Sequence, residues 1–134
     1  MKLQEPTIFV SISRTWGQKL VSERTGRRVT LEDCARGYWT LNPWGKAAEV
    51  KWLMAVSRNE IVGVWAIDKR KGTNGWMESP LSPKASWPED IVTGRMRYAC
   101  ELIPLPKEIS GKYCGRTMND LGLKPMRSPF RYVI

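Results

Sequence analysis

Two nearly continuous apolar runs constrain the fold more than any other feature of the sequence. They cover residues 50–57 (VKWLMAVS) and 61–67 (IVGVWAI), and the intervening Arg58-Asn59-Glu60 has the length of a hairpin loop. A strand with one face in solvent alternates apolar and polar residues, but these runs are apolar at almost every position. We therefore expect a β-hairpin at the centre of a sheet covered on both sides, with Trp52 and Trp65 in the core.

Shorter patterns predict the elements around this hairpin. Strands are expected at residues 7–13, 95–102 and 130–134, and short helices at 31–36, 43–48 and 115–121. Gly63 inside an apolar run predicts a bulge, a bend or a close approach by a ligand. No long helices alternate with the strands, which argues against a Rossmann-type layer. The sequence thus predicts one domain over residues 1–134 of the α+β class, mainly β. We expect a small curled β-barrel with short helices and long loops.

The charge of the chain indicates a polyanionic partner. Its 22 Lys and Arg residues outnumber 13 Asp and Glu residues, which gives a formal charge of +9. Such an excess favours nucleic acid or an anionic membrane surface. The alternative is a basic protein with no such partner, since net charge governs association and not fold.

The residue types present argue against catalysis and against a bound metal. The chain has no histidine, which removes Ser-His-Asp, Cys-His and His-metal chemistry, and it has no P-loop. The pairs Glu32-Asp33 and Glu89-Asp90 suit helix starts better than metal binding. We therefore expect no enzymatic activity and no cofactor.

The cysteines and the hydropathy pattern bear on where the protein works. Three widely spaced cysteines without histidine suit neither a disulfide framework nor a zinc site, so free thiols in a reducing cytoplasm are expected. The first residues hold no apolar targeting segment, and no run approaches the ~20 apolar residues of a membrane span. The expectation is a cytoplasmic protein with no membrane partner.

Arginines beside aromatic residues recur along the chain, and this combination suits nucleic acid. Guanidinium groups contact phosphates or base edges, and flat rings stack on bases. We expect the tryptophans at element ends to be exposed in a groove, and Arg36 with Trp39 to form a pocket mouth. In the alternative, Trp39 plugs the end of the barrel and Arg36 pairs with Asp33 or Glu32. The candidate nucleic-acid-binding residues are Arg14, Trp16, Arg36, Trp39, Trp44, Arg97, Arg127 and Arg131.

Several of these segments together resemble a group of bacterial and phage proteins with a PUA-like fold. The matching segments keep the order of the family: Arg14-Thr-Trp16, Ala35-Arg-Gly-Tyr-Trp39, residues 51–56, residues 60–67, Gly94-Arg-Met-Arg-Tyr-Ala99, Tyr113-Cys-Gly-Arg116 and Ser128-Pro-Phe-Arg-Tyr-Val133. Residues 69–90 depart from the pattern. PUA-like folds, including the ASCH and EVE branches, are small β-barrels, and many bind RNA or hold a flipped, often modified base. The resemblance implies a single PUA-like domain with an Arg/Trp-lined pocket for DNA or RNA.

Two other function classes compete with this hypothesis. A protein-interaction module would use exposed tryptophans as hot spots, for instance against a host defence complex if the gene is phage-encoded. A base-processing enzyme is the third class, because hydrolytic activity has been proposed for PUA-like relatives. The absence of histidine counts against that third class.

Overall fold

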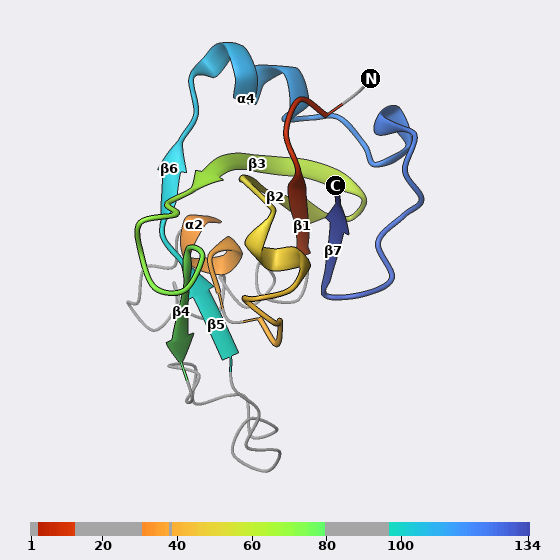
Figure 1. The fold of residues 1–134 in the computed structure, drawn as a ribbon. Helices are drawn as coiled ribbons and strands as arrows, with labels where there is room; N and C mark the ends of the chain where they lie inside the picture. Colours follow the sequence, from red (N-terminus) through yellow and green to blue (C-terminus); the bar gives the residue numbers. More distant parts are fainter. Residues whose placement is uncertain (1–2, 13–30, 38, 80–96) are drawn as a thin grey trace, which may run out of the picture.

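The computed structural model describes residues 3–12, 31–37, 39–79 and 97–134 (Figure 1). The described strands form a five-stranded mixed sheet in the order β6-β3-β2-β1-β7 and a two-stranded sheet of β4 and β5. In chain order the elements are β1 (Thr7–Ser11), α2 (Leu31–Ala35), the 3₁₀ helix η1 (Lys46–Ala48), β2 (Trp52–Ser57), β3 (Glu60–Ile67), β4 (Trp76–Ser79), β5 (Arg97–Cys100), β6 (Leu102–Pro104), α4 (Lys107–Tyr113), the 3₁₀ helix η2 (Asn119–Leu121) and β7 (Phe130–Val133).

The predicted hairpin is confirmed, and it lies in the middle of the larger sheet. β2 pairs with β3 in antiparallel fashion and with β1 in parallel fashion, so both of its edges are hydrogen-bonded. Arg58 and Asn59 form the turn with φ angles of 51° and 67°, both in the left-handed region that a tight two-residue hairpin turn requires. Glu60 belongs to β3, opposite Ser57. The loop is therefore one residue shorter than the sequence predicts.

A β-bulge in β3 reverses which residues face each side of the sheet. Val56 pairs with Ile61, whereas the preceding residue of β2 pairs with Gly63, so Val62 is an extra residue in β3. Regular alternation along the strand would place Ile61 and Trp65 on one face, but because of the bulge the two side chains belong to different core clusters. The bulge predicted at Gly63 is one position away.

Gly63 is needed because the ring of Trp65 folds back over the strand. A Cβ atom at position 63 would lie 2.7 Å from Cζ3 of that ring, closer than real contacts allow. The close approach that the glycine predicted thus involves a side chain of the same strand. Trp52 and Trp65 are 6% and 7% exposed, which confirms that both belong to the core.

The larger sheet is covered on both faces, as its apolar runs predict. Figure 1 shows α4 on one side of it and α2 with the β4–β5 sheet on the other. The first face packs through Phe9, Trp52 and Met54 against Tyr113, Met118 and Leu121. The second face carries Ile8, Val10, Leu53 and Trp65, and it packs against Cys34, Ala35, Ala47, Trp76 and Tyr98.

The described strands form an open sheet and a separate two-stranded sheet, and they do not close into a barrel. The mainly β, α+β class is confirmed.

The predicted strand at 95–102 divides because β5 pairs with β4 whereas β6 pairs with β3. Trp76 is 1% exposed and belongs to β4. Helix α4 was not predicted. No helix in the described part is long and apolar enough to cross a membrane.

Candidate nucleic-acid interface

Trp39 lies in the core, so its predicted exposure in a groove is wrong. Its side chain is 6% exposed, and its indole Nε1 donates to the carbonyl of Ala35 at 3.0 Å. That carbonyl, at the end of α2, would accept the amide of residue 39 if the helix continued. The amide instead donates to Tyr98 at 2.9 Å, and the indole N–H takes its place. The alternative that Trp39 plugs the core is the one that the structure supports.

Arg36 is partly exposed and forms an ion pair with Glu101. Its Nη1 lies 3.6 Å from a carboxylate oxygen of Glu101, and both side chains are about two-fifths exposed at 36% and 44%. This ion pair joins Arg36 to the β5–β6 junction, whereas the sequence led us to expect a partner on α2. The Arg36 carbonyl accepts the amide of Cys100 at 2.8 Å. Gly37 lets this segment approach β5, since a Cβ there would lie 2.8 Å from that of Ala99.

The remaining predicted arginines are dispersed over the described structure. Arg97 is partly buried at the start of β5, and Arg127 is exposed in the segment before β7. Arg131 lies on β7, and its Nη1 donates to the carbonyl of Lys124 at 3.0 Å. Two further candidates, Arg14 and Trp16, lie outside the described residues. The four predicted arginines that the structure describes thus lie at the end of α2, on β5, and on or just before β7.

Trp44 is the described tryptophan that matches the prediction of exposure. Its side chain is 67% exposed, whereas the four other described tryptophans are at most 7% exposed. The ring projects from a tight turn that begins at Asn42. The side-chain oxygen of Asn42 accepts the Trp44 amide at 3.0 Å, and its carbonyl accepts the amide of Gly45 at 3.1 Å. This turn leads into η1, so the short helix predicted at residues 43–48 is present but begins at Lys46.

The β3–β4 connection lies against this turn and carries most of the neighbouring charge. Asn74 donates from Nδ2 to the carbonyl of Pro43 at 2.9 Å. The Lys69 ammonium donates to the carbonyls of Ala48 at 3.2 Å and Asn74 at 3.1 Å. Burial lowers the pKa of Lys69, which is consistent with its place between the two loops. In the β4 strand that follows, the Trp76 indole N–H donates to Ala47 at 3.0 Å.

The Asp68–Arg70 ion pair in this connection orders the local backbone and neutralises one of its cations. Asp68 accepts the Arg70 amide at 3.0 Å and the Arg70 guanidinium at 2.9 and 3.0 Å. These hydrogen bonds lower the pKa of Asp68 to about 2. The charge of Arg70 is therefore largely neutralised, while Lys46 and Lys71 extend exposed into solvent.

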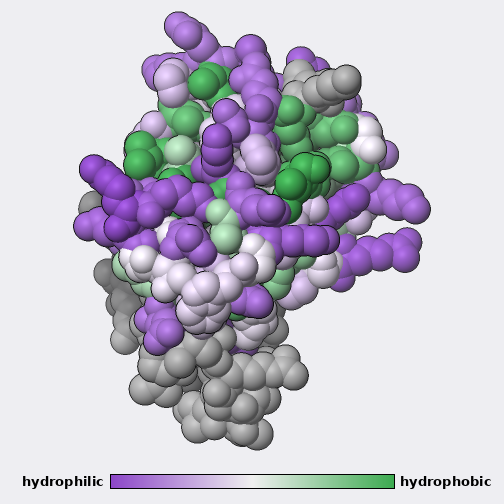
Figure 2. Space-filling model, in the orientation of Figure 1, coloured by the Kyte–Doolittle hydropathy of each residue, from purple (hydrophilic) through white to green (hydrophobic). Residues whose placement is uncertain are grey.

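We define the Trp44 surface as the exposed ring and the basic residues of the two adjoining loops. It consists of Trp44, Lys46, Lys69, Arg70, Lys71 and Asn74. The adjacent carboxylates are Asp68 and Glu49, so four cations stand against two anions. Hydrophilic side chains cover much of the face seen in Figure 2. The sequence signal was the run Lys69-Arg70-Lys71, which the resemblance left without a role.

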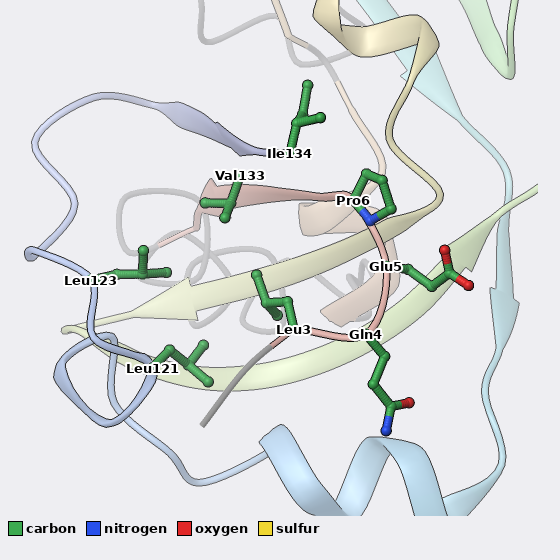
Figure 3. Close-up of a pocket in the computed structure, with 8 residues that line it drawn as sticks. All are labelled: Leu3, Gln4, Glu5, Pro6, Leu121, Leu123, Val133 and Ile134. Carbon is green, nitrogen blue, oxygen red and sulfur yellow. The ribbon is translucent and has the colours of Figure 1, made fainter.

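A separate cavity lies near the two ends of the chain, on the α4 side of the sheet. Its volume is about 420 Å³ and its lining is mostly aliphatic. Figure 3 shows Leu3, Leu121, Leu123 and Val133 around the hollow, with Glu5 pointing away from them. Hydrophobic side chains also gather around the C-terminal end in Figure 2. Because neither arginine nor tryptophan lines this cavity, it is not the base pocket predicted from the sequence.

The described residues offer no metal cluster and no activated thiol. No group of three or more Cys, Asp or Glu side chains within the described ranges could hold a metal ion. None of the three cysteines forms a disulfide bond; Cys34 and Cys100 are buried and Cys114 is exposed. Burial raises the pKa of Cys100 to about 12, so its thiol is protonated and unreactive at neutral pH.

Comparisons with protein-family models, with curated proteins and with solved structures found no match to this chain.

Proposed function

We propose that the protein is a non-enzymatic nucleic-acid-binding domain of the cytoplasm that uses the Trp44 surface. The observation that carries the proposal is the exposed Trp44 ring on a turn that contacts the β3–β4 connection, with exposed Lys46 and Lys71 on these two adjoining loops. An aromatic ring stacks on a base and ammonium groups neutralise phosphates, so the two together suit a nucleic acid strand. The formal charge of +9 adds a long-range attraction to any such polyanion.

The proposal keeps the PUA-like relationship but changes which residues would form the base pocket. The chain order of strand, Arg36 segment, hairpin and closing strand is the one that the resemblance rests on. Trp39 stabilises the core in this proposal and makes no contact with a base. A pocket for a flipped or modified base would then require Arg14 and Trp16, which remain candidates for phosphate and base contacts.

A protein-interaction module is the second candidate, and the same exposed ring favours it. Tryptophan is enriched among the residues that dominate protein interfaces. The two candidates differ in their response to salt, because each phosphate contact releases counterions whereas an aromatic contact does not. Salt dependence is therefore the measurement that separates them.

The test is binding of a fluorescently labelled single-stranded oligonucleotide over a series of salt concentrations. Each phosphate contact contributes about −0.7 to −0.9 to the slope of log affinity against log salt. Two contacts, from Lys46 and Lys71, would lower affinity about 7- to 12-fold between about 50 and 200 mM salt. No detectable binding at tens of micromolar in low salt would overturn the proposal and favour a protein partner.

Two charge variants localise the contacts on the protein. Lys46→Gln and Lys71→Gln should each make the slope shallower by about 0.7–0.9 without changing the fold, because both side chains are exposed. Lys107→Gln is the matched control, since Lys107 is exposed at the start of α4 on the other side of the sheet. Equal effects of all three substitutions would place binding elsewhere.

A further inference from the structure

We infer that the Trp44 surface selects single-stranded nucleic acid over duplex, with Trp44 as the stacking platform for one unpaired base. The inference rests on the proposed function and specifies its substrate class. Its basis is a ring that is 67% exposed at the tip of a tight turn, with cations on both adjoining loops. A base can present its π face to such a ring only when it is unpaired or unstacked from its neighbours.

The turn that carries Trp44 is held in place before any ligand arrives. Asn42 closes it from within, through bonds of 3.0 and 3.1 Å to the following amides. Asn74 and Lys69 fix it from outside by donating to the carbonyls of Pro43 and Ala48. Little backbone freedom is therefore lost when a base stacks on the ring, and preorganisation of this kind raises affinity.

The charge pattern is matched to a strand that passes over the ring. Lys46 follows Trp44 by two residues, and Lys71 is exposed on the second loop, two residues after Lys69. Lys69 and Arg70 have hydrogen-bond partners in the protein, so among the described cations of the Trp44 surface Lys46 and Lys71 are the ones available to phosphates. Two phosphate contacts give modest non-specific attraction, and discrimination must then come from the ring.

A duplex uses this arrangement poorly. Its bases already stack on one another, so Trp44 would reach a base face only by wedging between two steps and unstacking them. That unstacking costs at least as much as one new stack returns. The same two lysines contact phosphates of either form. The duplex should therefore bind through charge alone, with the affinity that the parent protein has for a strand whose bases cannot stack on Trp44.

The test compares three probes of equal phosphate number with the parent protein and Trp44→Ala. The probes are an oligodeoxythymidine of about 12 nucleotides, within the range of site sizes for small single-strand-binding domains, its abasic counterpart and a blunt duplex. The parent should bind the oligodeoxythymidine about 5- to 150-fold more tightly than the abasic strand, the value of one stacked base. Trp44→Ala should lose that preference and bind the abasic strand and duplex as the parent does.

A conservative variant and a fold check complete the experiment. Trp44→Phe keeps a stacking ring and should recover most of the preference for the oligodeoxythymidine. Circular dichroism and a thermal melt of each variant establish that the exposed substitution leaves the fold intact. If the parent binds duplex and single strand equally, or if Trp44→Ala weakens all three probes alike, the inference is wrong although the proposed function stands. If no probe binds in a salt-dependent manner, the proposed function fails as well.

Discussion

The core position of Trp39 makes a prediction about stability that can be worked out from its contacts. Replacing a buried aromatic residue by alanine costs about 3–5 kcal/mol of unfolding free energy, from lost burial and the cavity left behind. Trp39→Ala also removes the N–H that caps the Ala35 carbonyl. For a chain of 134 residues this corresponds to a fall in melting temperature of about 12–20 °C.

The hydrogen bond can be separated from the volume by a second substitution at the same position. Trp39→Phe keeps a buried ring but cannot donate to Ala35, so we expect a loss of about 1–3 kcal/mol. Trp44→Ala, five residues along the chain, is the matched control. Because Trp44 is 67% exposed, its removal should change stability by no more than about 0.5 kcal/mol.

The assay is urea denaturation followed by far-ultraviolet circular dichroism, with thermal melts as a second measure. The slope of unfolding free energy against urea should be similar for the parent and the variants, so the shift of the midpoint reports stability. A Trp39→Ala protein that unfolds with the parent would refute the core assignment. It would also return Trp39 to the list of surface residues available to a ligand.

Three further predictions concern packing, thiol chemistry and acid stability. Gly37→Ala should destabilise the protein by about 1–3 kcal/mol, because the new methyl group would overlap the side chain of Ala99. A variant that unfolds at the same urea concentration as the parent would contradict this contact. In the native protein a thiol reagent should label Cys114 well before the two buried cysteines, and rapid labelling of all three would show that the core is open. The pKa of Asp68 is lowered from 3.8 to about 2 by the Arg70 hydrogen bonds, so its contribution to stability is complete above 3.8 and disappears as the pH falls towards 2. Asp68→Asn should make unfolding less dependent on pH in that window, which acid titration at fixed urea measures.

Local patterns in the sequence determined the centre of the fold. Two apolar runs joined by a few polar residues can bury their side chains only as a paired hairpin with both faces covered, and β2 and β3 are arranged in this way. The alternating apolar residues Ile8 and Val10 likewise indicated one buried face of β1. The closing strand at Phe130–Val133 followed from its short apolar run. These elements are specified by contacts between residues near in sequence or by their own period.

Tertiary structure decided which strands pair at the edges and which tryptophans are buried. The run at 95–102 has one continuous pattern, yet β5 and β6 join different sheets because their partners come from elsewhere in the chain. Trp39 follows a helical turn and Trp44 precedes one, and nothing in their local sequence indicates which of the two is buried. Trp39 is buried because β5 passes beside it and offers the Tyr98 backbone, whereas Trp44 lies on the outer side of a turn. Burial depends on what packs against a side chain, and that is a property of chain segments distant in sequence.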